Sequence, residues 1–377
     1  MNKKVYIAGS GAYLPGDPIP FNDIDRFLGE LTDAPPEIKR WIERTRPIMA
    51  ELLDIEQLHY AIDPVTREFT EDNVTMSVKA ARAAFSDSAI HPRDIDLICY
   101  GSPHQDQMPT ASVRIQEALE IDRCAELSIH ANCTSAYKAL YLAHQLLEKG
   151  AYDTALVVSA NMASSELRAE YYNQPLLDKE SLFLRWFLSD GAGAVLLSTT
   201  PGHSKGYEVE QTYIESLGGH RPSLMFNERP ALWLNPKDEF ASGKHHLKQR
   251  FKNALATDSF QEKDGSIFMN GLKRMLKEKD IDILTVKRLQ INLPSKHIAE
   301  SLKDELEAAG IPASVIYSKL DRLGYSGPPT ALICLDKIVR EEPLMPGDRV
   351  ASFVTEVSKF MQAGYALRRH GRWEAGV

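Results

Sequence analysis

One cysteine, Cys133, stands where the sequence changes from a strand pattern to a helix pattern. Residues 125–130 predict a short strand, and residues 137–147 carry apolar side chains at helical spacing. The polar residues between them, such as Asn132 and Thr134, are typical of helix starts. A thiol at a helix N-terminus lies near the positive end of the helix dipole, which favours the reactive thiolate. The spacing alone leaves two interpretations open: a nucleophile, or a buried structural cysteine.

No other cluster of reactive residues has the spacing of a site. The remaining cysteines, Cys99, Cys124 and Cys334, form no CxxC pair, so neither a disulfide framework nor a cysteine metal site is predicted. The pair at residues 245–246 is His-His in a polar, Lys-rich stretch without a carboxylate or cysteine at ligand spacing. We interpret it as solvated surface and expect no metal.

The elements that would position Cys133 occur twice along the chain. Helices alternate with short apolar strands through residues 78–160, and the same plan recurs through residues 271–354. Such alternation predicts parallel strands joined by helical crossovers. We therefore expect a duplicated α/β fold, with one half at residues 1–205 and the other at residues 206–377. A chance alternation is the competing interpretation.

Composition excludes several classes of protein. The 377 residues include 44 Lys and Arg against 52 Asp and Glu, a net charge of −8, and 43% are hydrophobic. This composition is that of an ordinary globular protein, and the acidic balance gives no footprint for nucleic acid. The chain has no apolar run long enough to cross a membrane and no secretory signal pattern at its beginning. A cytoplasmic protein without membrane insertion is predicted.

Four segments, in the right order, resemble β-ketoacyl-ACP synthase III and its relatives in the thiolase superfamily. They are an opening strand and turn at 9–15, a helix and strand at 77–100, a Gly-rich turn at 190–197 and a last strand at 364–368. The resemblance places Cys133 as the nucleophile. It implies a thiolase-like fold with five layers (α-β-α-β-α), usually dimeric. It also implies an acyl group taken from a coenzyme A or phosphopantetheine thioester, with no permanently bound cofactor.

The second half departs from the family pattern at two positions. The family's condensing members use a His after a strand and an Asn in a Gly-Asn-Thr/Ser-Gly turn, which hydrogen-bond the thioester carbonyl during decarboxylation. Here Asn292 occupies the His position and Tyr325 the Asn position. Both can donate a hydrogen bond to an oxyanion, but neither accepts a proton near neutral pH. The usual decarboxylative route is therefore in question, whereas acyl loading on Cys133 is still expected.

Another residue must then serve as the base. His220 follows two glycines in a segment expected to cover the site, and we take it as the first candidate. His297 is the alternative if the alignment slips, and His104, just after a strand, is a further one. The irregular stretches at 165–185 and 219–265 are expected to form the covering segments and to shape a pocket.

Two more positions are carried over from the family. The backbone N–H of Lys359 is expected to pair with that of Cys133 as an oxyanion hole, although the family's glycines are replaced there. Met108, which precedes a proline, corresponds to the residue that reaches across the dimer into the neighbour's acyl pocket. Methionine is flexible, so this position does not define the acyl length.

These observations favour an acyltransferase or noncanonical condensing enzyme in fatty-acid-like or specialised (polyketide) metabolism. Its partners would be acyl-CoA or an acyl-carrier protein, and the chain would form a homodimer or pair with a homologue. Two alternatives stay open: a decarboxylative β-ketoacyl synthase that uses a different His, and a catalytically reduced subunit that pairs with an active homologue. An α/β-hydrolase is not supported, because Cys133 lacks the Gly-x-Ser/Cys-x-Gly elbow.

Overall fold

The computed structural model describes residues 2–104, 108–228, 233–250, 260–291 and 296–371. Its ten main strands form one mixed sheet in the order β14-β13-β15-β16-β8-β1-β7-β6-β4-β5. The strands are β1 (Tyr6–Tyr13), β4 (Leu97–Ser102), β5 (Ala125–His130), β6 (Thr154–Asn161), β7 (Gly191–Ser198), β8 (Tyr207–Ser216), β13 (Val286–Ile291), β14 (Ile316–Tyr317), β15 (Arg349–Glu356) and β16 (Met361–Arg369).

The strand order is the same in the two halves of the chain. Counted outward from the centre of the sheet, each half places its first, fifth, fourth, second and third strands. The pairing also repeats: β4 is parallel to β5 and β6, and β13 is parallel to β14 and β15. This repetition supports the division at 205/206, which lies between β7 and β8 and which we keep as a proposal.

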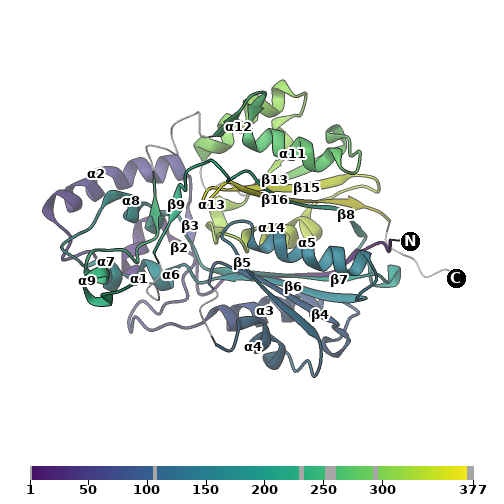
Figure 1. Ribbon diagram of the computed structural model, residues 1–377, viewed down its shortest axis with the longest axis horizontal. Helices are drawn as coiled ribbons and strands as arrows, with labels where there is room; N and C mark the ends of the chain where they lie inside the picture. Colours follow the sequence, from purple (N-terminus) through teal and green to yellow (C-terminus); the bar gives the residue numbers. More distant parts are fainter. Residues whose placement is uncertain (1, 105–107, 229–232, 251–259, 292–295, 372–377) are drawn as a thin grey trace.

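The two halves of the sheet form separate layers (Figure 1). Only Tyr6 and Glu208 join β1 to β8 in the described ladder, so the sheet opens there around two helices. These are α5 (Ser135–Glu148) and α14 (Thr330–Glu341), and they make the middle layer. The outer layers are α3 (Asn73–Ser86) with α4 (Ala111–Ala118), and α11 (Ile267–Lys277) with α12 (Lys296–Ala308). The predicted five-layered, thiolase-like arrangement is confirmed.

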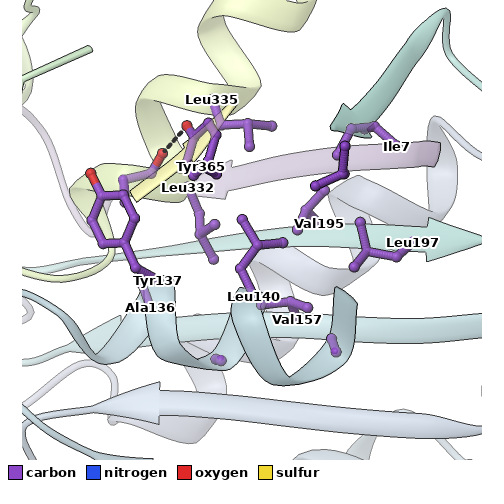
Figure 2. Close-up of a cluster of buried hydrophobic side chains, with 14 of the residues drawn as sticks. Ile7, Ala136, Tyr137, Leu140, Val157, Val195, Leu197, Leu332, Leu335 and Tyr365 are labelled. Carbon is purple, nitrogen blue, oxygen red and sulfur yellow. Dashed lines mark hydrogen bonds between the residues drawn. The ribbon is translucent and has the colours of Figure 1, made fainter. Parts of the chain in front are cut away.

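The middle helices are buried because their apolar side chains face both sheets. Figure 2 shows Tyr137 and Leu140 of α5 and Leu332 of α14 in one cluster with strand residues such as Val157 and Tyr365. A helix that is apolar on opposite faces is stable only between two layers. This packing holds the start of α5, and therefore the turn before it, in a rigid setting.

A cap covers one end of the sandwich (Figure 1). It consists of residues 17–62 and 163–188, which share one buried cluster with Tyr325 and half-buried Cys133. Its elements are β2 (Ile19–Pro20), α1 (Ile24–Leu28), α2 (Pro36–Leu53), β3 (Gln57–Leu58), α6 (Ser164–Leu167), α7 (Ala169–Tyr172) and α8 (Lys179–Leu182). The predicted covering segment at 165–185 therefore lies in this cap, as short helices rather than irregular chain.

Short elements from the second predicted covering segment, and one turn of helix, complete the described chain. They are β9 (Met225–Phe226), α9 (Pro236–Ala241), β10 (Lys248–Gln249), β11 (Gln261–Glu262), β12 (Gly265–Ser266) and α13 (Leu320–Leu323). A 3-10 turn, Ala313–Val315, begins after Pro312 and leads into β14. None of the described helices combines the length and apolar character needed to span a bilayer.

Candidate active site

Cys133 lies in the turn between β5 and α5, at the end of the sandwich that faces the cap. The turn is closed by a hydrogen bond from the backbone N–H of Ser135 to the carbonyl of Asn132, 3.0 Å long. Cys133 is half-buried and packs against both the sandwich core and the cap core. A side chain at Gly101 would lie 2.4 Å from the Ser135 carbonyl, so glycine is required for β4 to pass this close to the turn.

Tyr325 meets Cys133 from the other half of the chain. Its hydroxyl donates a hydrogen bond to the Cys133 Sγ at 3.3 Å, and its side chain is buried. It sits in a turn whose flanking glycines, Gly324 and Gly327, have φ angles of +64° and +73°, a conformation that favours glycine. The tyrosine ring packs on Phe187 of the cap, with ring centroids 5.8 Å apart. The structure thus brings two of the predicted site residues into contact.

Asn161, the last residue of β6, holds the Tyr325 turn. Its side-chain amide donates to the carbonyl of Ser326 at 2.9 Å, and its oxygen lies 3.1 Å from His104 Nε2. The other nitrogen of His104 is 3.7 Å from a carboxylate oxygen of Glu166 in the cap. His104 therefore connects the cap to the turn that carries Tyr325.

Glu356, the last residue of β15, holds the Cys133 turn, and the sequence analysis missed it. One carboxylate oxygen accepts hydrogen bonds from the backbone N–H (2.9 Å) and the hydroxyl (2.6 Å) of Thr134, and the other accepts from the Ser358 hydroxyl. Its side chain is only 1% exposed. The available signal was a single carboxylate at the end of an otherwise buried apolar strand, in the position that Asn161 has in the first half.

The site does not favour the thiolate, in contrast to the prediction from the helix start. Burial, and then the charge of Glu356, raise the pKa of the Cys133 thiol to about 12, although the Tyr325 hydroxyl acts in the opposite direction. Burial and the neighbouring Cys133 also hold the pKa of Tyr325 well above its ordinary value. The thiol and the phenol are therefore both protonated at neutral pH. The helix dipole is outweighed by the burial of the Cys133 sulfur and by a carboxylate from a distant strand, neither of which is visible in the local sequence.

The structure places His220 and Lys359 next to each other, without contact to Cys133 that we can describe. The backbone N–H of Leu217 donates to the carbonyl of Phe360 (2.9 Å), and the Lys359 ammonium donates to the carbonyl of Arg221 (2.7 Å). His220 is exposed in this loop, and no side-chain partner is found for it among the described residues. Its role as base and the role of the Lys359 N–H stay predictions.

The remaining predicted residues are placed as follows. Asn292 lies outside the described residues, and His297 falls within α12. Met108 is 97% exposed, between α4 and a segment that is not described. The prediction that His245 and His246 are solvated surface was wrong. Both belong to an aromatic cluster, in which they approach the carbonyl of Tyr171.

The described residues contain no group of three or more His, Cys, Asp or Glu side chains that could hold a metal ion. A surface cavity of about 470 Å³ lies near the chain termini, lined by residues that include Lys4, Glu208 and Arg368. The N–H of Lys3 binds the carbonyl of Glu148, the last residue of α5, so this cavity is at the opposite end of α5 from Cys133. It is not the pocket expected over the site.

Known proteins resemble this chain in sequence. The model of the family described as 3-oxoacyl-[acyl-carrier-protein (ACP)] synthase III matches residues 127–218, which include Cys133. The chain is 27% identical over 354 residues to a β-ketoacyl-[acyl-carrier-protein] synthase III of Methylococcus capsulatus, covering 93% of this chain and 94% of that protein.

Two solved structures share the fold. A variant of Xanthomonas campestris OleA superposes with a TM-score of 0.76 at 16% identity, covering 97% of this chain and 98% of that one. A tetronic acid condensing enzyme superposes with a TM-score of 0.74 at 18% identity, covering 97% and 99%. The fold is therefore thiolase-like. In sequence, the chain is similar to β-ketoacyl-[acyl-carrier-protein] synthase III along most of its length.

Proposed function

We propose that this chain is a thioester-dependent acyltransferase, or noncanonical condensing enzyme, that forms an acyl-enzyme on Cys133. The observation that carries the proposal is the contact between Cys133 and Tyr325 at a helix start, in a synthase III-like fold. The donor would be an acyl-CoA or an acyl-carrier-protein thioester. The acyl group would pass to a second substrate in fatty-acid-like or specialised (polyketide) metabolism.

The loading step breaks one thioester and forms another. The Cys133 sulfur attacks the carbonyl carbon of the donor, the carbon–sulfur bond to the donor breaks, and the Cys133 proton leaves with the donor thiol. Tyr325 remains a hydrogen-bond donor throughout, because its pKa lies well above neutral. Its hydroxyl is placed to stabilise negative charge on the sulfur or on the developing oxyanion.

The transfer step requires a base, because the second substrate must lose a proton. We propose His220 for this role, with Asn292 and the backbone N–H of Lys359 and Cys133 as donors to the carbonyl oxygen. Support comes from the packing of the His220 loop on the turn that contains Lys359. The change His220→Ala should leave loading intact and slow transfer about 10²-fold, the typical contribution of a positioned base.

The matched control is His91→Ala, which removes an exposed histidine before β4, outside the predicted site. Unchanged transfer in His220→Ala would remove His220 from the mechanism. The remaining donors would then only polarise the thioester.

We further propose a homodimer formed along the edge strand β5. This strand is last in the sheet, and its described side chains are half-buried or exposed, with Leu127 37% exposed. A strand at the edge of a sheet is a template for pairing with a second copy. Met108 is free to reach a neighbour's acyl pocket, as its exposure allows. The change Leu127→Arg should shift the sedimentation coefficient from dimer to monomer, and a monomeric wild type would favour pairing with a homologue.

Intact-protein mass spectrometry tests acyl loading. Wild-type protein incubated with a panel of acyl-CoA and acyl-carrier-protein thioesters should gain the mass of one acyl group. Cys133→Ala should gain none, whereas Cys124→Ala, which removes another half-buried cysteine, should load like wild type. An adduct that persists in Cys133→Ala would contradict the proposal. No adduct with any donor would favour the catalytically reduced subunit, which the raised thiol pKa also supports.

A further inference from the structure

We infer that Glu356 is a positioning residue that holds the turn carrying Cys133 and places a negative charge beside its sulfur. This inference deepens the proposed function by naming a residue that acts on the ionisation of the nucleophile. Its consequence for turnover rests on the proposed function. Neither the resemblance nor the motifs of the sequence assign a role to this position.

Among the described residues, hydrogen bonds and not a cation hold the Glu356 carboxylate. Glu356 is buried, and in the described part of the chain no Lys, Arg or His lies within ion-pair distance of it. A buried charge is costly unless it is hydrogen-bonded. Three donors meet that requirement here: the N–H and hydroxyl of Thr134 and the hydroxyl of Ser358. The protein therefore maintains an unpaired carboxylate next to the residue that follows Cys133.

Glu356 also binds a backbone N–H at the start of α5. The first backbone N–H groups of a helix are free to bind an anion. At this helix the N–H of Thr134 is already bound to the Glu356 carboxylate, so this N–H does not serve the Cys133 sulfur. The titratable groups that act on the sulfur are Glu356 and Tyr325, and Tyr137 lies close enough to respond to its charge. None of these groups supplies a positive charge to a thiolate.

The matching position in the other half carries a neutral residue, Asn161. Asn161 ends β6 as Glu356 ends β15, and each binds the turn of the opposite half. Asn161 binds the residue after Tyr325, and Glu356 binds the residue after Cys133. A neutral amide is thus sufficient to hold such a turn. The negative charge of Glu356 is therefore not needed to hold the turn, and it acts on the ionisation of the Cys133 thiol.

The test is the pH dependence of Cys133 alkylation by iodoacetamide, followed by peptide mass spectrometry so that the other cysteines are distinguished. Glu356→Gln retains an oxygen that can accept from Thr134 and removes the charge. The midpoint of its profile should fall by about one pH unit or more. The rate at about pH 8 should then rise roughly threefold per unit, because a thiolate of lower pKa is more abundant but less nucleophilic.

Two variants serve as controls. Glu356→Asp keeps the charge and should keep a midpoint closer to that of wild type. Glu210→Gln removes a carboxylate that is paired with Arg349 on the C-terminal sheet and should leave the profile unchanged. Equal midpoints in Glu356→Gln and wild type would overturn the inference, as would an equal fall in Glu356→Asp and Glu356→Gln.

The wild-type profile gives a second test that needs no variant to fold. Its midpoint should lie above that of an ordinary cysteine, about 8.5. A midpoint at or below this value would overturn the inference even if Glu356→Gln were not stable. Alkylation requires no acyl donor, so a chain that shows the expected profile but loads no acyl group would contradict the proposed function alone.

Discussion

The same turn of the two halves carries different chemistry. In each half the chain leaves its third strand and enters a helix of the middle layer, α5 or α14. The turn before α5 carries Cys133, and the turn before α14 carries Tyr325, so the two side chains meet at 3.3 Å. The duplication therefore places two equivalent turns face to face.

The residues that hold these turns differ in charge. Asn161 holds the Tyr325 turn with a neutral amide, whereas Glu356 holds the Cys133 turn with a carboxylate. The neutral Asn161 side chain adds no charge to the Tyr325 turn. The charged Glu356 side chain opposes ionisation of the Cys133 thiol. Equivalent positions in a duplicated fold thus share a structural task and differ in their effect on chemistry.

The largest expected effect is that of Tyr325→Phe, which removes the hydroxyl and keeps the ring that packs on Phe187. Loss of a single preorganised donor typically slows catalysis 10²–10³-fold, and we expect about 10²-fold slower acyl loading. Stopped reactions analysed by intact mass would measure it. The matched control is Tyr317→Phe, because the buried hydroxyl of Tyr317 has no hydrogen-bond partner in the described structure. Equal loading rates in both variants would show that the Tyr325 hydroxyl does not contribute to acyl loading.

Gly327→Ala tests how strictly the second turn is defined. Gly327 has a φ of +73°, and an added Cβ would lie 3.0 Å from the amide nitrogen of Asn161. The left-handed conformation alone costs about 1–2 kcal/mol for a residue with a side chain. We expect about 2 kcal/mol less stability by urea denaturation. Gly219→Ala, with open space around it, should change stability little. A similar stability of the two variants would show that the turn tolerates rearrangement.

Asn161→Asp replaces the neutral amide that holds the Tyr325 turn with a carboxylate, the group that Glu356 has at the Cys133 turn. The new carboxylate cannot donate to the carbonyl of Ser326, and we expect a loss of about 1–2 kcal/mol near neutral pH. The loss should be smaller in acid, where the protonated carboxyl can donate again. Urea denaturation at about pH 7 and pH 5 measures this difference. A loss that is independent of pH would contradict the assigned donor.

The smallest expected effect concerns the cap, which covers the Tyr325 turn. Burial lowers the pKa of His246 to about 4, and the ring stacks on Tyr172 while His245, Lys248 and Asp178 surround it. Because the unfolded chain has the higher histidine pKa, the stability from neutral His246 is complete above about pH 6.5 and is lost as the pH falls toward 4. His246→Phe keeps a stacked ring and should therefore flatten the pH dependence.

Melting temperatures at about pH 7 and pH 5 would measure this change. Wild type should lose roughly 2 °C more than the variant over this range. Asp190, whose pKa burial raises to about 6, acts in the opposite direction in both proteins, so the difference between them isolates His246. Parallel curves would show that the cap does not respond to this residue.

The layered fold could be predicted because local patterns repeat in the sequence. The alternation of helices and strands, which occurs twice, predicted a duplicated α/β fold, and the resemblance to β-ketoacyl-ACP synthase III implied its five layers; the structure has both. The sequence also showed that Cys133 precedes a helix and that Tyr325 lies in a glycine-flanked turn. Both are local signals, because helix-start residues and glycine spacing extend over only a few positions. Asn292, His220, Lys359 and Met108 stay predictions, since their roles depend on contacts that the sequence does not contain.

By itself, the sequence determined which residues could react and which elements would carry them. Only the tertiary structure decided the protonation of Cys133, because a pKa depends on burial and on charges within a few ångströms. Glu356 is 223 residues from Cys133 along the chain, counted as 356 − 133, and no local pattern connects them. The pairing of the two turns likewise needs both sheets to close around α5 and α14. Long-range packing, and not residue type, therefore set the electrostatics of this site.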